Sequence, residues 1–167
     1  MTSKEPHWTT GSDPTLLFSR YLDFYREKAI EKVLTLPSEE QSLSRVPSLW
    51  TPLQLLHHLA YMEQRWFVWG FLAEQVAEPF GDEVNGLWGV PADRDADQVV
   101  AMLRETGERT RGVLASYPLD TVAAVGGRFS DDPPTLSWIC FHVLQEYARH
   151  VGHVDVVREL LDGTTGE

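Results

Sequence analysis

The sequence has little of what a secreted or membrane protein needs. Its 167 residues include one cysteine, Cys140, so no disulfide can form within the chain. No stretch approaches the roughly 20 apolar residues that a membrane-spanning helix requires. The first twenty residues carry Lys4, Glu5 and Arg20 where a signal peptide would have an apolar run. We therefore expect a cytoplasmic protein with no membrane partner.

Basic side chains are also scarce. The chain has 14 lysines and arginines against 25 acidic residues, which gives a formal net charge of −11. Nucleic acids and anionic lipid surfaces attract clustered positive charge, so neither is expected as a partner. A small neutral or cationic ligand fits this composition better.

Strand-type alternation is missing, whereas apolar residues recur every three or four positions. Asp13 and Thr51 each precede a proline, which is typical of a helix start, and Gly163 is typical of a helix end. Four helices are predicted, over residues of about 13–35, 51–75, 95–116 and 135–162. Helices of this length with two long connections predict an all-α fold, a four-helix bundle, formed by a single domain over 1–167.

The connection from about Glu78 to Asp93 is rich in glycine and proline, yet it contains Phe80, Leu87 and Trp88. These side chains are too apolar for a simple linker. The segment is expected either to fold over a site as a lid or to pack against the helices, and the sequence does not separate the two.

Polar side chains fall on the apolar faces of the second and fourth predicted helices. At 100° per residue, His58 lies about 60° from the centre of its apolar stripe and His57 about 160° away. His58 is therefore expected in the core and His57 at the surface or an interface. In the last helix Glu146 and His150 both lie within about 40° of the stripe centre.

A buried carboxylate needs a positive partner, because its desolvation costs several kcal/mol. Glu146 and His150 are one helical turn apart and could share a cation with His58. This donor set suits Zn²⁺ and also accommodates Fe²⁺, Ni²⁺ or Mn²⁺, with open positions typical of a catalytic site in the bundle core. In the alternative interpretation, Glu146 simply pairs with a protonated His58 or His150.

Other residues near this set have more than one expected role. His153 could be a fourth ligand, a residue that holds a ligand or a water, or a general base. His142 is expected to have a structural role or to bond to Glu146, and Cys140 to be a small packing residue. Three tryptophans are expected mainly in the core, where they could also line a pocket: Trp66, Trp69 and Trp138.

Two segments resemble the DinB-like superfamily, in its actinobacterial branch of small proteins: LLHHLAYMEQRWF in the second helix and EYARHVGHVDVVRELLDG in the last. Relatives include metal-dependent mycothiol and bacillithiol S-transferases and the mycothiol-dependent maleylpyruvate isomerase. Their pattern of one histidine on the second helix and two ligands one turn apart on the last implies His58, Glu146 and His150. Many relatives have histidine where this chain has Glu146. A glutamate at this position is similar to the isomerase arrangement.

That isomerase has a second, C-terminal domain with no counterpart after Glu167, so we do not expect its reaction here. The resemblance implies a metal-dependent S-transferase in which a divalent metal activates a small thiol such as mycothiol for attack on an electrophilic substrate. One alternative is a metal-dependent hydrolase that uses metal-bound water, with His153 as general base. Another is a non-catalytic metal-binding module that mediates dimerisation. A homodimer is compatible with each of these functions.

Overall fold

The chain is mostly helical, in agreement with the all-α expectation. The computed structural model describes residue 6 and residues 11–166; the rest of the predicted domain, residues 1–5, 7–10 and 167, lies outside the described part. Four long helices are found in that part: α1 (Pro14–Leu34), α3 (Pro52–Gln64), α4 (Ala96–Ser116) and α5 (Leu136–Asp162). Two shorter helices accompany them: α2 (Ser38–Gln41) and the π-helix η2 (Arg65–Phe71), which continues α3.

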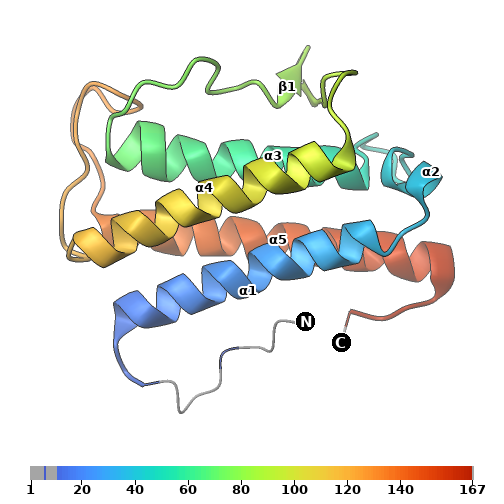
Figure 1. The fold of residues 1–167 in the computed structure, drawn as a ribbon, viewed down its shortest axis with the longest axis horizontal. Helices are drawn as coiled ribbons and strands as arrows, with labels where there is room; N and C mark the ends of the chain where they lie inside the picture. Colours follow the sequence, from blue (N-terminus) through green and yellow to red (C-terminus); the bar gives the residue numbers. More distant parts are fainter. Residues whose placement is uncertain (1–5, 7–10, 167) are drawn as a thin grey trace.

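The long helices run side by side along the long axis of the molecule (Figure 1). α1 packs against α5 and α4, and α3 packs against α4 and, less extensively, α5. The segment between η2 and α4 passes over α3 on the side away from α1 (Figure 1). The described residues include no helix long and apolar enough to cross a membrane.

The helix starts follow from local capping. The side chains of Asp13 and Thr51 accept backbone N–H bonds at the starts of α1 and α3, each followed by a proline that has no N–H to lose. The side chain of Asp95 likewise accepts a backbone N–H bond, from Gln98, at the start of α4. Gly163 ends α5 with a left-handed φ of 74°, as the sequence predicts.

The second predicted helix ends earlier than expected. It was predicted to about Gln75, but η2 ends at Phe71 and Ala73 adopts a left-handed φ of 53°. The loop between α4 and α5 accounts for this, because its backbone N–H groups cap the last carbonyls of η2: Ala124 bonds to Phe71 and Arg128 bonds to Trp69. Tertiary contacts therefore replace the last predicted turn.

A small hairpin was also not predicted. β1 (Glu83–Val84) pairs antiparallel with β2 (Leu87–Trp88) inside the apolar connection. Asn85 and Gly86 join the strands with φ of 54° and 78°, the two positive values of a tight hairpin turn.

A buried polar cluster ties three of the long helices together. Arg26 of α1 donates to both carboxylate oxygens of Glu63 on α3, at 3.1 and 2.6 Å. The hydroxyl of Tyr147 on α5 donates to the same carboxylate at 2.5 Å. Gly107 of α4 lies against the Arg26 guanidinium, where an added Cβ would come within 2.5 Å of Cζ. The cluster neutralises its charges internally and fixes how α1, α3 and α5 face one another, while α4 packs against it through Gly107.

Candidate metal centre

α3 and α5 bring together the three side chains singled out by the sequence. His58 comes from α3, and Glu146 and His150 come from consecutive turns of α5. Each offers one ligand atom, and these atoms all lie within 4.8 Å of one another. Glu146 is not enclosed, since its side chain is 19% exposed, while His58 and His150 are more buried. The group is therefore a partly open cluster that a small molecule can approach.

Asp82 orients His58. The His58 Nδ1 atom lies 2.8 Å from the Asp82 carboxylate, and a carboxylate can only accept, so Nδ1 carries the proton. In the neutral form of the ring, this tautomer leaves the lone pair on Nε2. A carboxylate that fixes a histidine tautomer in this way is the usual partner of a metal-ligating imidazole.

Asp82 itself is fully buried in the segment between η2 and α4. Arg65 donates to both of its oxygens, at 2.5 and 3.1 Å. Burial alone would raise the pKa of Asp82, but the hydrogen bonds from His58 and Arg65 lower the pKa below its ordinary value. The group is a carboxylate at neutral pH.

His150 is uncharged at neutral pH. Burial, followed by the neighbouring His58, lowers the pKa of His150 to about 4. Its Nε2 atom lies 3.2 Å from Glu146 Oε2, and its Nδ1 atom is buried without a hydrogen-bond partner in the described part of the chain. An ion pair with Glu146 needs a protonated imidazole, so this electrostatic setting disfavours the ion-pair alternative for His150.

Trp88 of the hairpin covers the cluster. Its ring stacks on His58 with centroids 4.2 Å apart and meets His150 edge-on at 5.1 Å. The apolar connection therefore packs against α3 and forms one wall of the cluster. The contacts of Trp88 are compatible with both expected roles of this connection, packing against the helices and covering a site.

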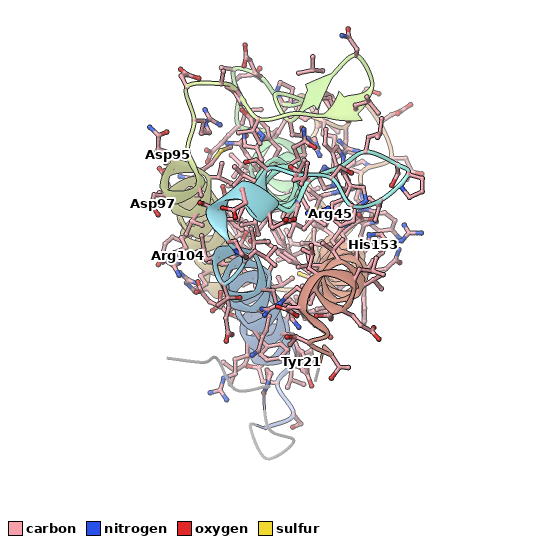
Figure 2. All side chains as sticks on the ribbon, turned by 90° about the vertical axis from the view of Figure 1, so that its right-hand side faces the viewer. Tyr21, Arg45, Asp95, Asp97, Arg104 and His153 are labelled. Atoms are coloured by element: carbon pink, nitrogen blue, oxygen red, sulfur yellow. The ribbon has the colours of Figure 1, made fainter. Side chains whose placement is uncertain are left out.

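His153 stands outside the group of close ligand atoms. Its ring lies 5.4 Å from His150 and 6.1 Å from Trp50, and the side chain is exposed. Figure 2 shows it at the outer edge of the molecule beside α5. This position lies next to the cluster, one turn further along the helix.

The expectation that His57 lies at the surface or an interface is wrong, because the side chain is completely buried. Its Nδ1 donates to the Gly89 carbonyl at 2.7 Å, and its Nε2 accepts from Arg94 at 2.8 Å. Burial lowers the pKa of His57. The prediction assumes that α3 has one buried face, but the connection between η2 and α4 covers a second face. α3 is therefore buried on two sides.

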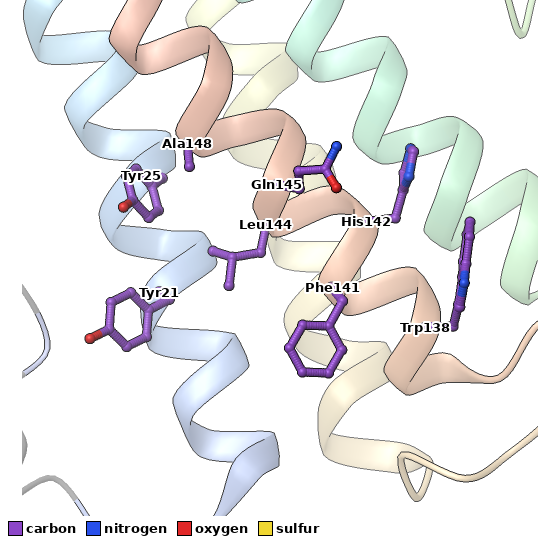
Figure 3. A pocket seen from close by; sticks show the side chains of 8 residues that line it. All are labelled: Tyr21, Tyr25, Trp138, Phe141, His142, Leu144, Gln145 and Ala148. Atoms are coloured by element: carbon purple, nitrogen blue, oxygen red, sulfur yellow. The ribbon is translucent and has the colours of Figure 1, made fainter.

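The expected core position of Trp138 is also wrong, since half of its surface is exposed. Its ring stacks on His142 at 5.3 Å, in an apolar surface groove along α5 (Figure 3). His142 lies 3.9 Å from Glu146, too far for a hydrogen bond. Trp66 and Trp69 are half-buried.

Cys140 is a buried packing residue, as the sequence predicts. Burial raises the pKa of its thiol to about 12, so almost none of it is thiolate at neutral pH. A sulfur nucleophile at this centre would have to come from a small molecule.

Comparison with known families adds one finding. A family model described as "MST: Mycothiol-S-transferase" matches residues 17–163. This range contains the three clustered side chains together with Asp82 and Trp88. The search of curated proteins gave no match.

Proposed function

Because the chain belongs to the mycothiol-S-transferase family, we propose that it is a metal-dependent enzyme that joins the thiol of mycothiol to an electrophilic substrate. The observation that carries this proposal is the close approach of His58, Glu146 and His150 beneath Trp88. We further propose that the long helices form a DinB-like four-helix bundle, a single domain with the site in its core.

The donor set fits a divalent metal. The bond to Asp82 directs the Nε2 atom of His58 toward the cluster as the available ligand atom, and the neutral His150 has a buried nitrogen without a hydrogen-bond partner among the described residues. Two imidazoles and one carboxylate are typical ligands of Zn²⁺, and they also suit Ni²⁺, Fe²⁺ or Mn²⁺. An ion held by these residues would lower the pKa of the cosubstrate thiol and so favour its thiolate form at neutral pH.

The surrounding residues perform the other tasks. Asp82 keeps the proton of His58 on Nδ1, and Trp88 shields one side of the cluster from water. The exposed edge of Glu146 leaves a path for the thiol and the electrophile. We also propose that His153, whose ring lies beside His150, takes up or delivers a proton at the rim of the cluster.

A conjugation assay tests the proposal. Metal-loaded protein is mixed with mycothiol and a bimane electrophile, and the conjugate is quantified. We expect conjugation well above background in the wild type and only background conjugation in His58→Ala. The control variant is Glu159→Gln, which changes an exposed carboxylate on α5 and should conjugate like the wild type. Wild-type conjugation no faster than that of His58→Ala would refute the proposal.

The metal itself is measured separately. Elemental analysis of the purified protein should find about one divalent ion per chain in the wild type and much less in Glu146→Ala. A wild type that carries no metal and takes up none would contradict the metal-dependent mechanism.

The same samples separate the alternatives. Turnover of esters or amides without thiol, reduced in His153→Gln, would support the metal-dependent hydrolase. Tight metal retention without any turnover would support the binding module. The exposed Phe80 and Leu87 are available for a homodimer, and light scattering on the purified protein measures the oligomeric state.

A further inference from the structure

A small cavity lies beside the metal centre, between the loop that precedes α3 and the β1–β2 hairpin. Its volume is about 240 Å³, smaller than the pockets that enclose drug-sized ligands, so it suits a single ring. Trp50 and Trp88 contribute indole rings to its lining, with centroids 6.4 Å apart and planes tilted by 55°. Two aromatic faces thus meet at an angle at one end of α3.

The cavity and the metal centre share a wall. Trp88 lines the cavity and also stacks on His58. Trp50 lines the cavity and lies 6.1 Å from His153, at the rim of the centre. A ligand whose reactive atom sits at His58 and whose remainder extends past Trp88 would enter this cavity.

The lining is neutral and can form hydrogen bonds. None of the side chains that the described part of the chain contributes to the cavity is charged. Ser48 offers a hydroxyl group, and Gln54 offers its NH₂ group because its oxygen already accepts the Thr51 N–H. Flat indole faces combined with neutral hydrogen-bonding groups favour a neutral, hydroxyl-rich ring over an anion or a purely apolar group.

The cavity walls are held in place before any ligand binds. The Gly89 N–H, directly after Trp88, donates to the Asp82 carbonyl at 2.8 Å, and the Gly89 carbonyl accepts from the buried His57. On the opposite side the Leu49 N–H donates to the Val46 carbonyl at 3.0 Å, which closes a turn in the loop before α3. Walls fixed in this way lower the entropic cost of binding a small ring.

We propose that the cavity between Trp50 and Trp88 is the subsite for one ring of the neutral polyhydroxylated part of the thiol cosubstrate, the N-acylated glucosaminyl-inositol portion of mycothiol. This inference rests on the proposed function, because it assumes that the thiol group itself is directed to the metal centre. It assigns cosubstrate selectivity to the loop before α3 and to the hairpin rather than to the metal ligands.

The test uses the full chain and a fragment without sulfur. N-acetylglucosaminyl-inositol, whose nitrogen is a neutral amide as in mycothiol, is titrated into the protein while the indole N–H resonances are followed by NMR. We expect the Trp50 and Trp88 signals to shift and the Trp138 signal to stay unchanged. In Trp50→Leu the fragment should bind about tenfold more weakly or worse, because one aromatic face is lost. Trp138→Leu is the matched control and should bind like the wild type.

Variant folding is checked by circular dichroism and thermal melting, and Trp50→Phe, which retains a flat face, should restore part of the affinity. Unshifted Trp50 and Trp88 signals, or equal binding by wild type and Trp50→Leu, would overturn the subsite even if conjugation is active. Fragment binding that depends on Trp50 in a protein without conjugation activity would support the subsite and refute the proposed function. The two failures are therefore distinguishable.

Discussion

Asp82 determines which nitrogen of His58 is available to a metal. Its carboxylate accepts a hydrogen bond from the Nδ1–H of His58, and two hydrogen bonds from Arg65 balance the negative charge of the carboxylate. Hydrogen bonds link Arg65, Asp82 and His58 in series, and Arg65 and Asp82 are buried. Protonation of Asp82 would leave the buried charge of Arg65 uncompensated. The tautomer of His58 is thus set by a residue 24 positions away in the sequence.

Replacing Asp82 with asparagine tests this role. The amide keeps the shape but is a weaker acceptor, so His58 should lose both basicity and fixed orientation. We expect metal affinity to fall about 10- to 100-fold, measured by competition with a chromogenic chelator. Glu83→Gln, an exposed neighbouring carboxylate, should bind as the wild type does. Equal affinities in all three proteins would show that Asp82 is purely structural.

His150 should make the metal-free protein sensitive to moderate acid. Its folded-state pKa of about 4 lies below its ordinary value of 6.5. As pH falls below 6.5 the unfolded chain takes up a proton that the folded chain does not, so stability decreases down to about pH 4. We predict that between pH 7.5 and 5 the wild type loses about 1–2 kcal/mol more of its unfolding free energy than His150→Gln.

Urea denaturation of the metal-free proteins at both pH values measures this difference. The comparison is made with His150→Gln because burial also lowers the pKa of His57 and of His142, and both remain in the variant. An identical pH dependence in the two proteins would mean that His150 titrates normally.

The sequence was sufficient to select the three clustered side chains but not their partners. His58, Glu146 and His150 lie on the apolar faces of regular helices. There the period of 3.6 residues per turn determines the direction in which each side chain points. Asp82 and Trp88 lie in an irregular connection, whose path depends on contacts that no local pattern encodes. The predicted position of His57 is wrong for the same reason, because helical periodicity contains no information about a loop that covers a second face of α3.

At the level of elements, the helix starts were predictable and one helix end was not. Asp13, Thr51 and Asp95 cap their helices through bonds to residues two or three positions away, so the sequence contains both partners. The end of η2 instead depends on N–H groups of Ala124 and Arg128, more than 50 positions further along the chain. Local patterns predict local partners only.

Two glycines of α4 give a matched test of helix packing. Gly107 faces Arg26, whose guanidinium is held by Glu63, so an added methyl group would force this buried pair apart. We expect Gly107→Ala to lower the free energy of unfolding by about 1–3 kcal/mol despite the better helix propensity of alanine. Gly112 has nothing within 4 Å of an added Cβ, so Gly112→Ala should raise stability by up to about 1 kcal/mol.

Chemical denaturation of both variants gives these values. Because the two substitutions are identical and lie on one helix, the difference between them isolates the contact with Arg26. A stabilising Gly107→Ala would show that Arg26 can move aside without losing Glu63.

At the level of the whole molecule, the proposed metal would join elements that are distant in the sequence. His58 lies on α3, Glu146 and His150 lie on α5, and these two helices pack less closely against each other than α1 does against α5. A cation held by both helices would add a link between two helices with few direct packing contacts. It would also bring positive charge to a chain with a formal net charge of −11.

Metal binding should therefore raise the stability of the entire fold. A ligand at 100 times its Kd stabilises the folded state by about 2.7 kcal/mol, which for a chain of this size corresponds to a rise in Tm of roughly 5–10 °C. We expect this rise when Zn²⁺ is added to the metal-free wild type and to Glu159→Gln, and its absence in Glu146→Gln. Calorimetry with and without chelator measures it. An equal rise in Glu146→Gln would place the stabilising ion elsewhere, because the amide cannot replace the charge that this carboxylate would bring to the metal.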